Sequence, residues 1–167
     1  VVFAMFGYNE SFSGPQAADS HKKLLIDFVS KIRSYKPNGK DFPRIVLFSP
    51  IAFEDLKDRN LPRGKAHNKN LSAFSKATQE AAREAGVAYV DLYGPTLKLY
   101  EQSKEALTLN GVHLNELGNK KVGEIITQAL LETRTIASPA NEKLRQAVLQ
   151  KNWHWHNRYR ATDGNDV

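Results

Sequence analysis

The chain of 167 residues contains no cysteine. It therefore has no disulfide framework, no thiolate ligands for a metal ion and no cysteine nucleophile. It also lacks an apolar run of the roughly 18 residues that would cross a bilayer, so we expect no membrane span. An initiator methionine and a signal peptide are absent, and the sequence starts directly in an apolar segment. Because such segments are typical of buried strands, we expect an N-terminal part of the same protein to precede this chain.

The composition is that of one soluble globular domain, with 41% hydrophobic and 25% charged residues. The net charge is +6, but lysine and arginine are scattered among acidic residues. A nucleic-acid partner is therefore not expected. The aromatic and basic cluster WHWHNRYR at residues 153–160 leaves nucleic-acid binding as a weaker alternative. Such binding would require strongly salt-dependent affinity.

Three apolar runs rich in β-forming residues occupy residues 1–6, 44–50 and 87–92. Longer segments with helical periodicity follow them, at about 16–35, 68–84 and 116–131. The alternation predicts an α/β fold in three layers, with a parallel sheet between helices and with one or more N-terminal strands absent from this chain. In the first helix, the predicted buried stripe consists of Leu24, Leu25, Phe28, Val29 and Ile32.

The domain is predicted to span residues 1–132, and residues 133–167 are predicted to form a C-terminal helix with an aromatic and basic tail. That tail either packs on the domain through Trp153 and Trp155 or leads onward. His154 and His156 would share one face of an extended strand, as metal ligands can. No further ligand lies nearby in the sequence, so we predict no metal site.

Gly7, Asn9 and Glu10 follow the first strand directly. A glycine permits a sharp turn, and an asparagine amide on that turn can donate a hydrogen bond to a developing oxyanion. A turn-forming asparagine explains the same residues without chemistry. Glu10 is expected to accept a hydrogen bond within its own turn, and Asp91, at the end of the third strand, to cap the turn that follows.

His113 lies in the segment NGVHLNELG, just before the helix predicted at 116–131. Loops that follow parallel strands meet at the carboxyl edge of the sheet, so Asn9 and His113 are expected at the same edge. An oxyanion donor and a base suit acyl transfer. Residues 50–64, which follow the second strand, are a candidate wall of the site or an ordinary exposed connection. His21 and His67 are expected to have no chemical role.

The order of a GxN[DE] block, a strand ending in SP, a strand ending in VDL and the segment GVHLN resembles the back half of the SGNH, or GDSL-like, esterase and lipase family, over about residues 1–132. The resemblance implies that Asn9 is the oxyanion-hole side chain, that Gly7 permits its turn and that His113 is the general base. It also implies that the nucleophilic serine precedes this chain. Ser11 and Ser13 lack the strand-to-helix setting of such a nucleophile.

Asn110 stands where the family has the aspartate of its DxxH block. Three possibilities follow: a Ser-His dyad whose imidazole is oriented by Asn110 or a backbone carbonyl, a carboxylate from elsewhere, or loss of catalysis. We favour the dyad, because the rest of the segment is intact. The aspartate would stabilise the imidazolium, and an amide keeps only the geometry.

The resemblance thus implies a serine-type ester hydrolase that acts on a small acyl ester, such as a carbohydrate ester, and needs no cofactor. The 167 residues alone are expected to be inactive. The localisation stays open, with a lean toward periplasmic or secreted. The alternative is a non-catalytic module of the same fold that binds a carbohydrate or a protein partner.

Overall fold

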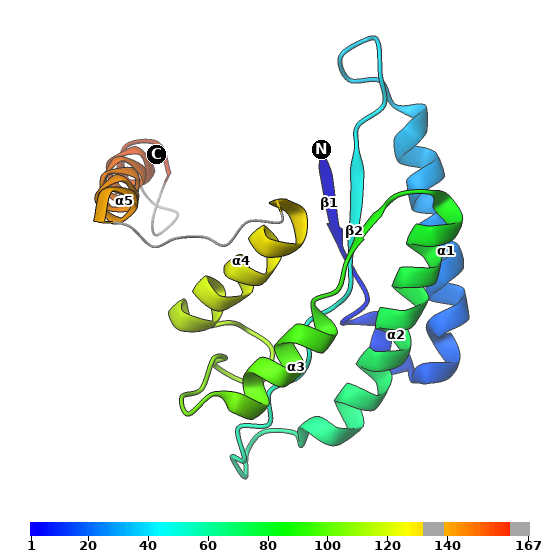
Figure 1. Ribbon diagram of the computed structural model, residues 1–167, viewed down its shortest axis with the longest axis horizontal. Coiled ribbons are helices and arrows are strands. Elements are labelled where there is room, and N and C mark those ends of the chain that lie inside the picture. Colours follow the sequence, from blue (N-terminus) through cyan, green and yellow to red (C-terminus); the bar gives the residue numbers. More distant parts are fainter. Residues whose placement is uncertain (132–138, 161–167) are drawn as a thin grey trace. The chain divides into compact units, whose positions relative to one another are not determined.

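The computed structural model describes residues 1–131 and 139–160. Strands β1 (Val2–Met5), β2 (Ile45–Phe48) and β3 (Ala88–Val90) form a sheet in the order β1-β2-β3 (Figure 1). All strand pairs are parallel, with Met5 opposite Phe48 and Phe48 opposite Val90. The predicted parallel α/β sheet is confirmed.

Five α-helices surround the strands or follow them in the described residues: α1 (Ala18–Ser34), α2 (Gly64–Ala85), α3 (Tyr93–Gln102), α4 (Glu116–Leu131) and α5 (Pro139–Tyr159). Two short 3₁₀ turns, η1 (Glu10–Ser13) and η2 (Pro15–Ala17), connect β1 to α1. Helix α2 starts at residue 64, not at 68 as predicted.

The sheet is covered on both faces, which explains why all four residues of β2 are buried. On one face, Leu47 packs with residues of α1 and α2, including Leu25 and Ala81. On the other face, Phe48 packs against Ile125 and Ile126 of α4. Figure 1 shows α1 and α2 on the side of the sheet opposite α4. The architecture is therefore three-layered, as predicted.

Helix α1 corrects one predicted core residue. Leu24 is 64% exposed, whereas His21, Leu25 and Val29 are the buried residues of this helix. These three follow one another at intervals of four, so His21 extends the stripe by one turn toward the N-terminus. The predicted periodicity is confirmed, and the predicted first residue of the stripe is wrong.

The chain divides into two compact units, residues 1–133 and 134–167. In the second unit, α5 includes residues 153–159 of the WHWHNRYR cluster, so the extended strand considered for His154 and His156 is wrong. Residues two apart on a helix point about 200° away from each other and cannot share one face. Trp153 and Trp155 are exposed. The predicted boundary at 132/133 and the end of the predicted tail, residues 161–167, lie outside the described residues.

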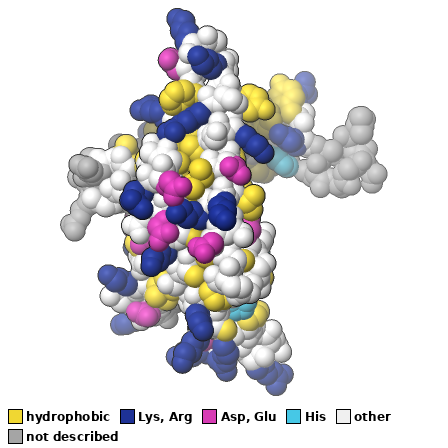
Figure 2. Space-filling model, turned by 90° about the vertical axis from the view of Figure 1, so that its right-hand side faces the viewer, with side chains coloured by type: hydrophobic (Ala, Val, Ile, Leu, Met, Phe, Trp, Pro, Cys, Tyr) yellow, Lys and Arg dark blue, Asp and Glu magenta, His cyan; other side chains and the backbone are white. Residues whose placement is uncertain are grey.

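Basic and acidic side chains are interspersed over the middle of the face shown in Figure 2, in keeping with the scattered charges of the sequence. Lys22 of α1, for example, pairs with Glu84 of α2 at 2.8 Å. None of the described helices combines the length and the hydropathy that crossing a membrane requires.

Candidate active site

The turns that follow the three strands leave the sheet at one edge. Because β1, β2 and β3 are parallel and in register, the segments that begin at Gly7, Ser49 and Asp91 all start at the carboxyl edge (Figure 1). In open parallel sheets, ligands bind outside this edge. The side chains on these turns are therefore the first candidates for chemistry.

The turn after β1 is built around Gly7. Its φ of +110° is one that residues with a side chain rarely adopt, and its N–H donates to the Glu10 carboxylate at 3.0 Å. Glu10 thus bonds within its own turn, as expected. The exposed side chain of Asn9 has no hydrogen-bond partner among the described residues, so its amide is free to donate to a ligand.

The two serines near this turn do not resemble nucleophiles. Ser11 is 3% exposed, and its hydroxyl donates to the carbonyl of Tyr8 at 2.6 Å. Ser13 is exposed in the last position of η1. Neither lies at a junction between a strand and a helix, where a nucleophile of this type is presented.

His113 lies on a narrow hairpin-like loop. Thr108 and Leu114 form an isolated antiparallel bridge, and the N–H of Leu109 donates to the carbonyl of His113 at 2.8 Å. Asn110 and Gly111 form the tip. The side chains of Asn110 and His113 are both exposed.

The Asn110 side-chain oxygen accepts three hydrogen bonds. The donors are the backbone N–H of Val112 at 3.3 Å, the backbone N–H of His113 at 3.0 Å and Nδ1 of the His113 ring at 3.0 Å. Backbone N–H groups only donate, so the amide must turn its oxygen toward them. In the neutral ring the proton must then lie on Nδ1, and Nε2 has the lone pair. This is the tautomer that a general base requires.

The loop that follows β2 supports the His113 loop. The N–H of Glu54 donates to the carbonyl of Gly111 at 2.9 Å, and the buried Glu54 carboxylate contacts residues 107 and 108. Residues 50–64 are a candidate wall in the sequence, but their local pattern does not single out Glu54. Nothing in that pattern distinguishes a buried carboxylate from the exposed acids around it, and nothing near Thr108 marks it as a partner.

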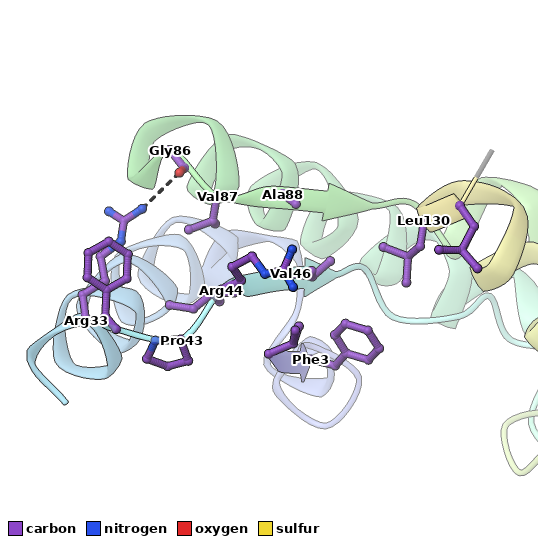
Figure 3. A pocket seen from close by; sticks show the side chains of 13 residues that line it. Phe3, Arg33, Pro43, Arg44, Val46, Gly86, Val87, Ala88 and Leu130 are labelled. Atoms are coloured by element: carbon purple, nitrogen blue, oxygen red, sulfur yellow. Dashed lines mark hydrogen bonds between the residues drawn. The ribbon is translucent and has the colours of Figure 1, made fainter. Parts of the chain in front are cut away.

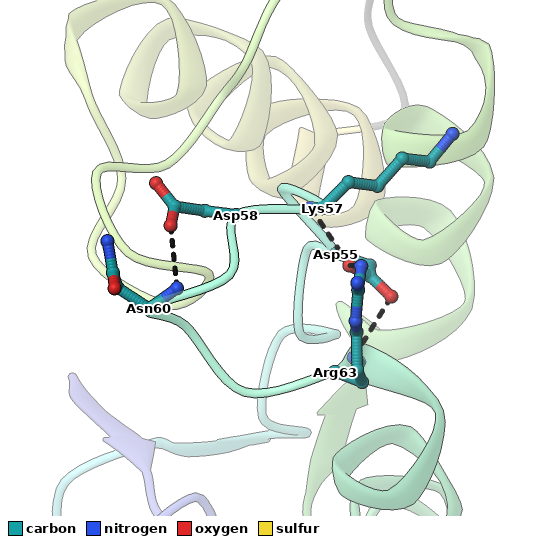
Figure 4. Close-up of polar contacts among 6 residues, drawn as sticks. Asp55, Lys57, Asp58, Asn60 and Arg63 are labelled. Carbon is teal, nitrogen blue, oxygen red and sulfur yellow. Dashed lines mark hydrogen bonds and ion pairs between the residues drawn. The ribbon is translucent and has the colours of Figure 1, made fainter.

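The outer part of this loop is ordered by its own acidic side chains (Figure 4). Asp55 accepts hydrogen bonds from the N–H groups of Lys57 at 3.0 Å and Gly64 at 3.3 Å, and lies 3.7 Å from Arg63. The hydrogen bond from Lys57 is the main cause that lowers the pKa of Asp55. Residues 50–64 are therefore a structured loop.

Three packed rings link the turn after β1 to the His113 loop. His67 of α2 is stacked on Phe53 at 4.8 Å between ring centres and lies edge-on to Phe12 at 5.4 Å. Phe53 in turn lies so close to Gly111 that a Cβ there would overlap its ring. His67 thus has a packing role that the sequence does not reveal.

Ser49 and Asp91 belong to the framework of the edge. The Ser49 hydroxyl donates to Asp91 at 3.1 Å and accepts from the N–H groups of Leu92 at 2.8 Å and Tyr93 at 3.0 Å. Asp91 also accepts from the N–H of Gly94 at 3.3 Å, so it caps the start of α3. Both residues have a structural role here.

Two cavities lie at opposite edges of the sheet. One of about 410 Å³ opens at the carboxyl edge and is lined by Tyr8, Ser49, Leu114 and apolar side chains of β1 and α4. The other, of about 530 Å³, lies at the amino ends of the strands, beside Arg33 and Arg44 (Figure 3). No group of three or more His, Asp or Glu side chains within residues 1–131 and 139–160 could hold a metal ion.

Solved structures with the same fold are hydrolases by their names. An alpha/beta hydrolase from the metagenome of Lake Arreo, Spain, shares 16% identity at a TM-score of 0.56, over 77% of this chain and 58% of the other. A peptidoglycan O-acetylesterase shares 17% at 0.60, over 78% and 37%. A mutant acetyl-xylooligosaccharide esterase from Geobacillus shares 15% at 0.57, over 82% and 61%. At these identities, the likeness concerns the fold alone.

The chain spans less than two thirds of each of these three proteins. No curated protein sequence matches it significantly. The sequence profile of the GDSL-like Lipase/Acylhydrolase family, however, matches residues 1–121, which is most of the chain and includes both the turn at Gly7 and the loop of His113. The chain therefore belongs to the GDSL-like lipase/acylhydrolase family.

Proposed function

We propose that the protein hydrolyses carboxylic esters, with His113 as general base, Asn9 as oxyanion donor and a serine nucleophile supplied from outside these 167 residues. The observation that carries the proposal is the contact of 3.0 Å between the Asn110 oxygen and Nδ1 of His113. This contact supports the proposed role of His113, because it orients an exposed imidazole so that Nε2 can accept a proton.

The proposed reaction has two halves, acylation of the serine and hydrolysis of the acyl-enzyme, and His113 and Asn9 have the same roles in both. The serine hydroxyl attacks the ester carbonyl while Nε2 of His113 takes its proton, and the Asn9 amide donates to the tetrahedral oxyanion. The imidazolium then gives the proton to the departing alcohol, which leaves an acyl-enzyme. Water then attacks the acyl-enzyme while His113 takes its proton, and the serine recovers this proton as the carboxylic acid leaves. Asn110 stays neutral and orients the ring throughout.

The substrate class that we propose is a small acyl ester of a carbohydrate. The names of two structural neighbours, a peptidoglycan O-acetylesterase and an acetyl-xylooligosaccharide esterase, support this choice. The competing function is a non-catalytic module that binds a carbohydrate or protein partner at the same edge. It predicts binding without turnover.

The first experiment asks whether the complete protein is a serine hydrolase. We expect a fluorophosphonate probe to label it and a short-chain aryl ester to be hydrolysed. His113→Ala should lower kcat roughly 10² to 10⁴-fold, since general acid and base catalysis contributes that much. His156→Ala is the matched control, because His156 is exposed on α5. Absent labelling together with absent turnover would favour the binding module, and equal activity of both variants would show that His113 is not the general base.

The second experiment addresses the oxyanion donor. Asn9→Ala should lower kcat by roughly 10² to 10³-fold with a smaller change in KM, because the donated hydrogen bond matters most in the transition state. Asn38→Ala, in the exposed loop between α1 and β2, should leave kcat unchanged. A loss confined to KM would mean that Asn9 binds the ground state and does not stabilise an oxyanion.

A further inference from the structure

We propose that Glu54 and Thr108 are positioning residues that fix the His113 loop and, through it, the orientation of the imidazole. The inference rests on the proposed role of His113 as the base. Neither residue touches the ring. Both act through Gly111 and Asn110, which separate them from His113.

Glu54 is an acid in the interior, only 6% exposed. Its carboxylate accepts the N–H of Leu107 at 3.0 and 3.1 Å, the N–H of Thr108 at 2.7 Å and the hydroxyl of Thr108 at 2.6 Å. Every one of these partners is a donor. A buried carboxylate persists only when hydrogen bonds replace the water that it has lost, and here all of them come from the start of the His113 loop.

Thr108 connects Glu54 to Gly111 through its hydroxyl group. Its hydroxyl proton points to Glu54, so its oxygen is available as an acceptor, and the N–H of Gly111 donates to it at 2.9 Å. The carbonyl of Gly111 accepts the N–H of Glu54 at 2.9 Å. The peptide groups on both sides of Gly111 are therefore held by residue 54, one directly and one through Thr108.

The backbone conformation and the close packing of Gly111 restrict the loop further. Its φ is +95°, and a Cβ at this position would overlap the ring of Phe53. The next residue toward the N-terminus is Asn110, whose oxygen holds Nδ1 of His113 at 3.0 Å. A shift of Gly111 would thus move Asn110 and release the ring.

Burial does not hold Asn110 and His113 themselves, since both are exposed. Among the described residues, the loop tip is anchored to the rest of the domain by the hydrogen bonds that lead to Glu54, directly and through Thr108, and by the contact with Phe53. Loosening these bonds should therefore disturb the ring more than it disturbs the core of the domain.

The test compares two substitutions of one residue in the complete protein. Thr108→Val keeps the shape of the side chain and removes the hydroxyl, whereas Thr108→Ser keeps the hydroxyl. We expect Thr108→Val to lower kcat about ten- to a hundredfold, with KM changed less than about threefold, because a small misplacement of a catalytic group has effects of that size. Thr108→Ser should stay within about threefold of the parent.

A readout apart from activity separates this inference from the proposed function. Nitrogen NMR of the His113 ring should show one dominant tautomer, with the proton on Nδ1, in the parent and in Thr108→Ser, and a mixture in Thr108→Val. Glu54→Gln, which puts an amide N–H₂ among donors, should behave like Thr108→Val. An unchanged tautomer and unchanged kcat in Thr108→Val would overturn the inference. A changed tautomer with no effect of His113→Ala on activity would instead sink the proposed function alone.

Discussion

At the scale of single residues, the pairing of Asn110 with His113 decides which tautomer the proposed base adopts. In a serine protease, replacing the triad aspartate by asparagine lowers kcat about 10⁴-fold, with the wrong tautomer as the cause. Here two backbone N–H groups fix the amide with its oxygen toward the ring. The tautomer is therefore preserved, and only the negative charge is missing.

The sequence predicted that Asn110 and His113 lie together, and their contact of 3.0 Å agrees with this; the catalytic dyad itself stays a prediction. The sequence could not predict the two backbone donors, because they depend on the φ and ψ angles of the loop. Glu54 was missed for a related reason. Its burial results from a contact with residues more than fifty positions away in the sequence.

The first prediction at this scale concerns charge and orientation at Asn110. Asn110→Asp should raise kcat by about tenfold, since a carboxylate near the imidazolium at a partly screened site stabilises it by about 1 to 4 kcal/mol, much of it offset by solvent. Asn110→Leu removes the acceptor and should lower kcat, by up to roughly 10⁴-fold. Steady-state kinetics of the complete protein measures both. Equal kcat in the leucine variant and the parent would show that Asn110 does not orient the base.

At the scale of secondary structure elements, α4 begins immediately after the His113 loop. The side-chain oxygen of Asn115 accepts the N–H of Gly118 at 2.8 Å, which caps the first turn. A cap followed by an apolar stripe made this helix predictable at residues 116–131, and its observed bounds are the same. At α2, by contrast, Arg63 precedes the helix without any side-chain cap, so the sequence held no signal for its start.

The close approach of α4 to the loop gives the second prediction. A Cβ at Gly118 would overlap the carbonyl oxygen of Leu107, a backbone atom that cannot turn aside. Gly118→Ala should lower the free energy of unfolding by about 1 to 3 kcal/mol or more.

Gly123, one and a half turns later in α4, is the matched control, because a Cβ there would meet nothing within 4 Å. Gly123→Ala should be neutral or stabilise by up to about 1 kcal/mol, as alanine favours the helix interior. Urea unfolding of the two variants against the parent gives the comparison. Similar stabilities of the two alanine variants would mean that the loop at Leu107 can shift to accommodate the added Cβ without loss of stability.

At the scale of the whole molecule, two apolar clusters on opposite faces of β2 hold the domain together. Alternation of apolar strands and amphipathic helices was enough to predict these layers. It was not enough to predict which side chains border them. In α1, both His21 and Leu24 fit a helical stripe, and the packing of His21 beneath Gly7 and against Phe74 decided between them.

This burial makes the stability of the molecule depend on pH. Burial lowers the pKa of His21 below its ordinary value of 6.5, and the negative charge of Glu10 opposes the shift only in part. Below pH 6.5 the unfolded chain binds a proton that the folded protein resists, so stability is full above this pH and declines as the pH falls toward the lowered pKa. Urea unfolding at about pH 7.5 and about pH 5.5, on either side of the ordinary pKa, should show the decline.

Replacing the imidazole isolates its contribution. In His21→Leu, the loss of stability between the neutral and the acidic measurement should be smaller than in the parent, whatever the absolute stability of the variant. His156→Leu, at an exposed position on α5, should keep the dependence of the parent. The same pH dependence in all three proteins would show that protonation of His21 does not couple to folding.

The amide of Asn110 has one more consequence. A carboxylate that steers an imidazole gains a proton in acid and then loses its hold, whereas an amide has no such equilibrium in water. Residue 110 itself should therefore keep its contact with the His113 ring in acid for as long as the domain stays folded, whereas an aspartate at that position would not.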